Sequence, residues 1–418
     1  DEEVLDAGVL AGGAGRVGTI HDASPLAFEY ATTWLERATP MAVAAIPLQP
    51  GRQNSAAVQA FFENLLPEGE LRDYLAAQRK ASTLFSLLLE VAGDTAGGFV
   101  IVPGGEVPQP PAYEHTTWQA IAAILRKKSA AAIDLQGEGA RISLAGAQDK
   151  TSIAIFDDGV PRLPKGASPS THILKPNIRR LAKVWHSAAN ETIVMRMAGH
   201  CGLPTAEVFY EPHTESCVVT RFDRIKRADG TLARLVQYDL CQLAGTASDR
   251  KYEKEGGPGL PTCAELIRRY STQPALDLRR FVDWILFNLY VGNNDSHAKN
   301  LSLYAVPNQG VLLTPFYDLM CTRLYPGLSQ EFAFSIGGEF KPGSMTRQHL
   351  EALAGQLGMR PQFLLRQAAD LAAKVPAGLH RALEETHPAL SHSARALASK
   401  LAHFIESTTK KTAARFSR

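Results

Sequence analysis

The sequence predicts an α+β protein with two lobes, the first a mixed lobe that contains β-strands and the second mostly helical. Short strand-like segments separated by Gly and Pro are frequent before residue 221, whereas helical periodicity prevails from residue 237 onward. The chain has 418 residues, of which 45% are hydrophobic, so it can form two or three domains with substantial cores. We predict domains at 1–105, 112–236 and 237–418.

The composition narrows the class of protein. Lys and Arg number 44 against 42 Asp and Glu, and this balance does not favour binding to nucleic acid or membranes through charge alone. The five cysteines form no CxxC pair, which is typical of reduced thiols in a cytosolic protein. No apolar stretch approaches the roughly 18 residues that span a bilayer, and the acidic start is not that of a signal peptide. We therefore expect a cytoplasmic protein without membrane segments.

The N-terminal segment contains a misleading glycine motif. Gly13, Gly15 and Gly18 match the GxGxxG fingerprint of dinucleotide-binding folds, but that fingerprint requires a helix to begin at its glycines. Here the residues that follow Gly18 are typical of a strand and a turn. We therefore predict a Gly-rich hairpin between strands at 4–10 and 16–20.

The rest of the first half alternates between short helices and strands. Apolar periodicity, stop signals and turn residues predict helices at 56–66, 73–78, 84–91, 118–127 and 190–199, with a short one around Trp34. Strands are predicted at 27–30, 99–102, 152–156, 161–164, 171–176, 206–210 and 216–221. The segment 104–111 has three prolines and is predicted to be a linker.

The second half is predicted to be helical apart from short strands. Helices are expected at 262–270, 276–290, 347–356, 361–375, 378–385 and 393–407, and strand-like pieces at 301–304, 311–313 and 331–336. Two residues, 376 and 377, separate the fourth of these predicted helices from the fifth. The basic tail, with Lys410, Lys411, Arg415 and Arg418, is expected to be frayed.

Asp295, Asn300 and Asp318 are the first candidates for chemistry. Asp295 follows a nearly all-apolar helix, Asn300 comes five positions later, and Asp318 follows two strand-like pieces. A rigidly held carboxylate can accept a proton from a hydroxyl group, while the other two side chains offer oxygen ligands that suit Mg²⁺. Protein kinases use this spacing. We therefore predict an Asp base, an Asn/Asp metal pair and a bound nucleotide, rather than an Asx-rich turn that only ends a helix.

Lys175, on the predicted strand 171–176, is a candidate contact for phosphate groups because a Lys in a cleft acts as a point charge. Glu191 falls in the first turn of the predicted helix 190–199. It can orient Lys175, or it can simply suit the helix dipole, and the sequence leaves both interpretations open.

Residues 143–151 are the candidate phosphate-binding loop. Gly146, flanked by Ala145 and Ala147, lets backbone N–H groups approach a phosphate closely, although the segment lacks the GxxxxGK[ST] pattern. Phe222 can stack against an adenine or can be a core aromatic at a strand end, and both readings stay open. His297 has no other His or Cys at metal-ligand spacing, so we expect a structural or substrate-orienting role rather than a zinc site.

Taken together, these motifs resemble the HipA family of bacterial serine/threonine kinases, the toxins of type II toxin–antitoxin modules. The resemblance covers most of the chain. It rests on Arg16-Val17-Gly18-Thr19, Phe62-Glu63-Asn64-Leu65-Leu66-Pro67, Ile142-Ser143-Leu144-Ala145-Gly146-Ala147-Gln148-Asp149-Lys150-Thr151, Thr171-His172-Ile173-Leu174-Lys175, Arg221-Phe222-Asp223-Arg224, Gln237-Tyr238-Asp239, Lys251-Tyr252-Glu253, Gly256-Gly257-Pro258-Gly259, Asp295-Ser296-His297-Ala298-Lys299-Asn300 and Leu313-Thr314-Pro315-Phe316-Tyr317-Asp318.

The resemblance implies a kinase-like fold, closer to lipid kinases than to ordinary protein kinases, with nucleotide held by the domain 112–236 and catalysis in the domain 237–418. Asp295 would be the catalytic base, assisted by His297 and Lys299, and Asn300 and Asp318 would hold Mg²⁺. Ser143 would be a site of autophosphorylation that switches the enzyme off; physically, a dianion on a loop that cradles ATP phosphates should repel them. The residues expected to contact ATP are Ala145, Gly146, Ala147, Gln148, Asp149, Lys150, Lys175, Arg221, Phe222, Asp223 and Gln237.

The family also implies partners. Its members act on aminoacyl-tRNA synthetases, best known for glutamyl-tRNA synthetase, and pair with a small helix-turn-helix antitoxin (HipB-like) that binds operator DNA. One departure concerns the general kinase pattern: the catalytic segment begins Asn293-Asn294-Asp295 and lacks the His-Arg pair of ordinary protein kinases.

Two other functions are compatible with parts of the pattern. A small-molecule kinase shares the Asp…Asn…Asp arrangement, but it has no need of a self-phosphorylated loop serine such as Ser143. A kinase-shaped corepressor scaffold for a DNA-binding antitoxin would be free to lose Asp295, Asn300, Asp318 or Lys175, and all four are present. The sequence therefore favours an ATP- and Mg²⁺-dependent serine/threonine protein kinase that acts as a toxin.

Overall fold

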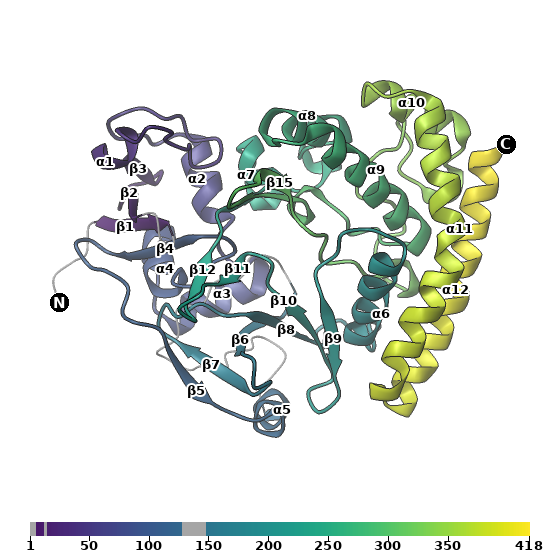
Figure 1. Ribbon diagram of the computed structural model, residues 1–418, viewed down its shortest axis with the longest axis horizontal. Coiled ribbons are helices and arrows are strands. Elements are labelled where there is room, and N and C mark those ends of the chain that lie inside the picture. The colour runs from purple at the N-terminus through teal and green to yellow at the C-terminus, as the bar shows by residue number, and fades with distance from the viewer. Residues whose placement is uncertain (1–5, 12–14, 128–147) are drawn as a thin grey trace. The chain divides into compact units, whose positions relative to one another are not determined.

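The structure is a computed structural model that describes residues 6–11, 15–127 and 148–418. The chain forms two compact units, each assembled from separate segments (Figure 1). Unit 1 contains Asp1–Leu174, Arg221–Asp249 and Tyr304–Pro307, and unit 2 contains Lys175–Thr220, Arg250–Leu303 and Asn308–Arg418. Helices and strands are both abundant, as an α+β chain requires.

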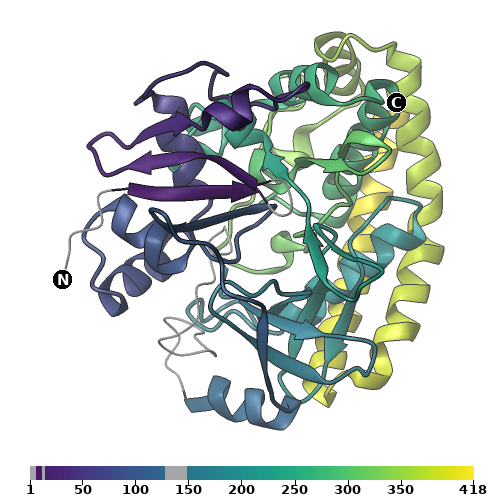
Figure 2. The ribbon, with the colours of Figure 1, turned by 60° about the vertical axis from the view of Figure 1, so that its left-hand side comes forward.

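The first part of unit 1 is a four-stranded antiparallel sheet with short helices (Figure 2). Its strands lie in the order β3-β2-β1-β4: β1 (Asp6–Ala11), β2 (Gly15–His21), β3 (Ala27–Tyr30) and β4 (Phe99–Pro103). The helices are α1 (Thr32–Leu35), α2 (Ala56–Glu63), α3 (Gly69–Gln78) and α4 (Leu84–Val91). The strands and helices predicted for this segment are confirmed, although α2 ends three residues early and α3 begins four residues early.

The glycine motif belongs to the β1–β2 hairpin. The two strands pair up to Ala11 and Gly15, and Gly15 and Gly18 both lie in β2, so no helix begins at either of them. Gly13 lies outside the described residues. Gly18 lies inside β2, where an added Cβ atom would be 2.4 Å from the Glu29 carbonyl oxygen of β3. A side chain cannot fit there, so close strand packing, and not dinucleotide binding, accounts for this glycine.

The second part of unit 1 is also antiparallel. Strands β5, β7, β6 and the start of β8 lie in that order, and Asp157, Asp158 and Gly159 form the predicted turn between β6 and β7. The elements are β5 (Ala112–His115), α5 (Trp118–Lys127), β6 (Thr151–Ile155), β7 (Pro161–Lys165), β8 (His172–Pro176), β11 (Arg224–Lys226), β12 (Leu232–Arg234), β13 (Gln237–Asp239), α7 (Leu240–Ala244) and η2 (Ser248–Arg250). Strands β5, β11, β12 and β13 were not predicted, because strands of three or four residues show little periodicity.

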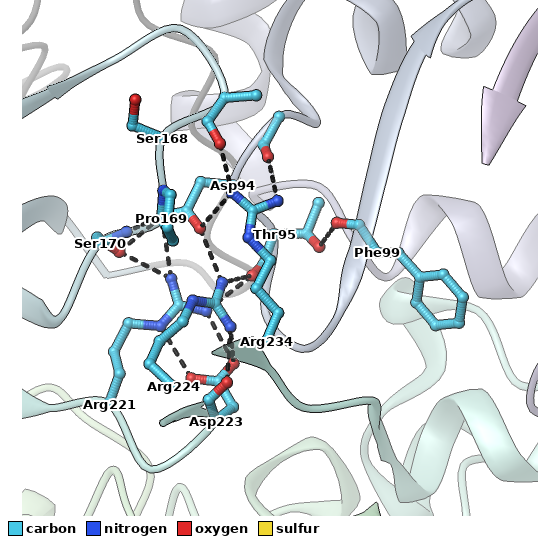
Figure 3. A network of polar contacts seen from close by, with 12 residues as sticks. Asp94, Thr95, Phe99, Ser168, Pro169, Ser170, Arg221, Asp223, Arg224 and Arg234 are labelled. Carbon is cyan, nitrogen blue, oxygen red and sulfur yellow. Dashed lines mark hydrogen bonds and ion pairs between the residues drawn. The ribbon is translucent and has the colours of Figure 1, made fainter. Parts of the chain in front are cut away.

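A buried network of charges joins distant segments of unit 1 (Figure 3). The Asp94 carboxylate lies 2.7 Å from Arg224 and 3.2 Å from Arg221, and it accepts a 2.6 Å hydrogen bond from the Ser170 hydroxyl. Asp223 lies 2.8 Å from Arg221. Burial alone would raise the pKa of Asp94, but the nearby guanidinium groups hold this pKa well below its usual range. The charges stay ionised because each has a partner.

Unit 2 is mainly helical. Helices α6 (Ser187–His200), α9 (Pro274–Val291), α11 (Pro361–Thr386) and α12 (His392–Ser417) pack against one another, and α11 and α12 run side by side (Figures 1 and 2). The other elements are β9 (Val208–Glu211), β10 (Ser216–Thr220), η3 (Glu253–Glu255), α8 (Leu260–Tyr270), η4 (Ala298–Asn300), β14 (Ser302–Val306), β15 (Gly310–Leu313), η5 (Thr322–Leu324), η6 (Pro342–Ser344), α10 (Arg347–Gln356) and η7 (His387–Ala389). No described helix of the chain is long and apolar enough to cross a membrane.

Three predictions for unit 2 were wrong. The segment 331–336 forms no named strand, only an isolated bridge between Ile336 and Glu339. Pro376 does not divide α11, because the buried residues around it, such as Val375 and Leu379, keep the helix packed despite the missing N–H group. The tail is not frayed: α12 continues to Ser417, and Phe416 is buried.

Candidate active site

The loop with Asp295 begins at a sharp turn behind a buried helix. Helix α9 carries large buried side chains, among them Trp284 and Tyr290, so the helix is fixed in the core of unit 2. It ends at Gly292, whose φ of +73° is the left-handed conformation that glycine adopts readily. A Cβ atom at Gly292 would lie 2.9 Å from Phe404. The turn therefore requires glycine both for its backbone angle and for space.

Two buried asparagines hold the loop that carries Asp295. Asn293 donates a 2.7 Å hydrogen bond to the Asn288 side chain of α9, and its own side-chain oxygen accepts from the Asp295 backbone N–H at 3.2 Å. The backbone N–H of Asn294 donates to the Thr322 hydroxyl at 2.8 Å. Asp295 itself is exposed, whereas its neighbours are buried. The structure thus presents one carboxylate on a rigid loop.

Asn300 and Lys299 complete this loop. The Asn300 side-chain NH₂ donates to the Asp295 carbonyl oxygen at 3.1 Å, which leaves the amide oxygen as the group suited to a cation. Lys299 is buried, and its carbonyl oxygen accepts a 2.9 Å hydrogen bond from the Tyr317 hydroxyl. This bond fixes the loop next to the segment that leads to Asp318.

Lys175, Glu191 and Asp318 form a cluster of charges. The Lys175 ammonium lies 2.6 Å from Glu191 and also forms a short ion pair with Asp318, although 143 residues separate Lys175 from Asp318. Burial would lower the pKa of Lys175, but the two carboxylates outweigh burial and raise this pKa above its ordinary value. Asp318 adopts φ +54° and has a side chain that is 32% exposed, so its carboxylate is accessible.

The structure decides between the two interpretations of Glu191. Helix α6 begins at Ser187, three residues before its predicted start, so Glu191 is not in the first turn. It is buried, with 1% of its surface exposed, and it contacts Lys175. Pairing with Lys175, and not the helix dipole, accounts for this residue.

Tyr252 is a site residue that the sequence reasoning did not single out. Its hydroxyl donates a 2.5 Å hydrogen bond to an Asp295 carboxylate oxygen, and its ring packs edge-on against His297, with centroids 5.2 Å apart. His297 is buried, and desolvation lowers its pKa well below the ordinary value, helped by the charges of Lys251 and Lys299. A neutral His297 therefore supports Tyr252. The only sequence signal for Tyr252 was its motif, Lys251-Tyr252-Glu253.

The donors in unit 2 fit a magnesium ion better than a zinc ion. Within the described residues, no group of three or more His, Cys, Asp or Glu side chains is arranged to hold a metal, and all five cysteines are free and buried. Asp318 and Asn300 instead offer one carboxylate and one amide oxygen. Mg²⁺ typically takes one or two carboxylates and completes its shell with water and substrate phosphates.

Unit 1 contains the other residues predicted to contact nucleotide. Gln148 Nε2 and Gln237 Oε1 are buried, and neither has a hydrogen-bond partner in the described part of the chain. Such atoms fit a polar ligand that would satisfy them. Asp149 is buried and Lys150 half-buried, while Ser143, Ala145, Gly146 and Ala147 lie outside the described residues.

Residues 221–223, which follow β10, can offer a nucleotide their backbone groups and an aromatic ring, but not free charged side chains. The side chains of Arg221 and Asp223 are buried and engaged in the network with Asp94. Phe222 is half-buried, and its ring lies edge-on to Tyr304 at 5.7 Å between centroids. A nucleotide role for this segment, which stays a prediction, would therefore use backbone groups and Phe222.

Comparison with known proteins gives consistent matches over nearly the whole chain. The family model described as the HipA N-terminal domain matches residues 9–102, and the HipA-like C-terminal domain matches residues 142–379. A Sinorhizobium fredii protein named "Putative kinase Y4mE" is 34% identical over 399 residues, which cover 91% of each chain. The serine/threonine-protein kinase toxin HipA of Shewanella oneidensis is 28% identical and covers 85% of this chain and 83% of its own.

A solved structure supports the fold independently. The Shewanella oneidensis toxin–antitoxin structure of HipA, HipB and operator DNA contains a chain that matches with a TM-score of 0.85, 24% identity and 98% coverage of both chains. This likeness concerns the fold.

Proposed function

This chain is a serine/threonine protein kinase of the HipA family, and we propose that it transfers the γ-phosphoryl group of ATP to a protein serine with the help of Mg²⁺. The observation that carries the proposal is the cluster of Lys175, Glu191 and Asp318 in the same unit as the rigid Asp295 loop. ATP would supply the phosphoryl group, and Mg²⁺ would offset the charge of its phosphates.

Each residue has a specific role in this proposal. Asp295 accepts the proton of the substrate hydroxyl. Tyr252 holds its carboxylate in place, and Asn293 fixes its backbone N–H group. Asp318 and Asn300 provide oxygen ligands for the metal. Lys175, kept charged by its carboxylate partners, provides positive charge for the phosphates. His297 and Lys299 are buried, so they support the loop rather than touch the substrate.

We also infer the wider setting from the family. The proposed partner is a helix-turn-helix antitoxin like HipB, which would carry the contacts to operator DNA. The proposed substrate is an aminoacyl-tRNA synthetase, with glutamyl-tRNA synthetase first. The same proposal includes three further points. The protein is cytoplasmic, its fold is closer to lipid kinases than to ordinary protein kinases, and its domains are 1–105, 112–236 and 237–418.

The test is mass spectrometry of the phosphatase-treated full-length protein before and after incubation with Mg²⁺ and ATP, alone and with glutamyl-tRNA synthetase. We expect one phosphate at Ser143 and at least one on the synthetase. The Asp295→Asn variant should add neither, because its amide cannot take the proton, while it should still bind ATP in calorimetry. General-base loss typically slows transfer by about 10²–10⁴-fold.

Three outcomes would contradict parts of the proposal. If Ser143→Ala protein still gains the same phosphate, Ser143 is not the autophosphorylation site. If ATP binds but no phosphate appears on the protein, the synthetase or a small-molecule acceptor, the chain acts as a scaffold for its antitoxin. If the Asp295→Asn variant no longer binds ATP, Asp295 is a nucleotide or metal ligand and not the general base.

A further inference from the structure

A basic cavity lies along α12, in unit 2, outside the Lys175 cluster and the Asp295 loop. Its volume is about 730 Å³, and its walls come from α12, η5 and η6. We call it the α12 groove. Its cationic or imidazole side chains are Arg323, Lys400, His403, Lys411 and Arg415.

The periodicity of α12 places these groups on one face. Residues Ser399, His403, Ser407, Lys411 and Arg415 follow one another at intervals of four, so they lie in one row of the helix. The adjacent row contributes Lys400, Phe404, Thr408 and Thr412 to the same groove. The only acidic residue of α12, Glu406, does not line it. Every polar side chain that this helix offers to the groove is therefore a cation, an imidazole or a hydroxyl group.

These charges lack acidic partners in the described part of the chain. No carboxylate lines the groove, and no ion pair involves Arg323, Lys400, Lys411 or Arg415 among the described residues. Arg323 Nε is buried without a hydrogen-bond partner there. Burial lowers the pKa of Arg415, and the neighbouring charge of Arg323 lowers it further. By contrast, the buried arginines around Asp94 are each paired.

The remaining contacts show which cationic side chains of the groove are already held by the protein. Arg415 donates to the carbonyl oxygens of Met345 at 3.0 Å and Pro342 at 2.9 Å, so it is fixed in the wall. The Arg323 guanidinium lies 5.7 Å from the centre of the Phe404 ring. A ligand with negative charge would offset the charges of Arg323 and Arg415 and reduce the repulsion between their guanidinium groups.

We propose that the α12 groove binds a small ligand that carries two or more phosphate groups. Ligand pockets typically measure about 300–1,000 Å³, so this volume suits a small molecule. Cations contributed by both η5 and α12 suit more than one phosphate, and Arg and Lys with neighbouring hydroxyl groups are typical phosphate-binding side chains. The half-buried Phe404 ring offers an apolar surface beside them. The proposal does not depend on the catalytic roles given above.

Adjacent lysines on α12 provide a matched test. Lys411 lines the groove, whereas its neighbour Lys410 does not. Lys411→Gln and Lys410→Gln each remove one positive charge, so a difference between the two variants reports on the groove and not on the net charge. Sodium tripolyphosphate is titrated into each full-length protein by calorimetry at physiological ionic strength, with orthophosphate and a 20-nucleotide single-stranded DNA as further probes. Circular dichroism verifies that each variant is folded.

We expect Lys410→Gln to bind tripolyphosphate like the wild type, and Lys411→Gln to bind about fivefold or more weakly. Arg323→Gln combined with Lys411→Gln should remove the binding that depends on the groove. Equal affinity of all variants would overturn the proposal, as would no binding at all. Equal affinity for orthophosphate would show that a single phosphate suffices. Binding of DNA but not of tripolyphosphate, dependent on Lys411, would assign the groove to a nucleic-acid backbone instead.

Discussion

Asp295 is the exposed residue in an otherwise buried stretch, 291–300. The Tyr252 side chain, from another segment, contacts its carboxylate. A hydrogen bond from a phenol to a carboxylate holds the carboxylate in one orientation. A general base has to be positioned within hydrogen-bond reach of the proton it accepts. We therefore assign Tyr252 as a positioning residue for Asp295.

Tyr252→Phe tests this assignment because it removes only the hydroxyl group and keeps the ring against His297. We expect kcat for phosphoryl transfer to fall by about tenfold, on the scale of one lost charge-assisted hydrogen bond. The affinity for ATP measured by calorimetry should stay unchanged. An unchanged kcat would show that the hydroxyl has no part in holding the base.

At the scale of the element, the junction between α9 and the loop that carries Asp295 depends on Gly292. Its φ of +73° strains any other residue, and a Cβ atom would meet both Phe404 and Arg323. Gly292→Ala should therefore lower the thermal unfolding midpoint by several degrees and reduce kinase activity together, because the loop begins there.

Gly355→Ala is the matched control for this prediction. Gly355 lies in α10, and a Cβ atom there would meet nothing within 4 Å. Alanine is the better helix former by about 0.5–1 kcal/mol, so this variant should be as stable as the wild type or slightly more so. If Gly292→Ala behaved like Gly355→Ala, the turn would tolerate a side chain.

The last turns of α12 contribute to the core of unit 2. Phe416 is 3% exposed and Thr412 is 2% exposed, and Arg415 anchors the segment that contains Pro342 and Met345. Phe416→Ala should lower the free energy of unfolding by about 3–5 kcal/mol, the usual effect of removing a buried aromatic ring. Denaturant unfolding followed by circular dichroism would measure this change. Arg418, two residues further on, is exposed, so Arg418→Ala should leave the free energy of unfolding unchanged.

The helices show which local signals can be read from a sequence. Apolar periodicity located α4, α5 and α10 at their observed bounds, because both the pattern and the stop signals lie within each segment. The same approach failed for Pro376 and for the tail after residue 407. In both places the local preference is overridden by packing against other helices of unit 2.

At the scale of the whole molecule, the partly desolvated His172 makes stability depend on pH. Desolvation lowers the pKa of His172 from 6.5 to about 4. The folded protein binds this proton less readily than the unfolded chain does. The histidine therefore contributes its full stability above pH 6.5, and this contribution is lost as the pH falls through 6.5 toward 4.

Between pH 7 and pH 5 this single group should reduce the free energy of unfolding by about 2 kcal/mol, at 1.36 kcal/mol per pKa unit. Thermal midpoints measured across that range should fall less steeply in His172→Asn, because its side chain does not titrate. The same slope in both proteins would rule out His172 as a source of the acid sensitivity.

The sequence by itself determined the α+β class, the majority of elements, and the spacing of Asp295, Asn300 and Asp318 that predicts kinase chemistry. These features depend on neighbours along the chain, whose side chains and backbone preferences act over a few residues. The roles of the individual site residues stay predictions until the variants are measured.

Only the tertiary structure decided which distant groups meet. It brought Lys175 to Asp318 across 143 residues, placed the Tyr252 hydroxyl on Asp295, and gathered cations along α12 around a cavity without carboxylates among the described residues. Such contacts arise when helices and strands pack into a core, and packing is a property of the whole folded chain. No local pattern in the sequence contains that information.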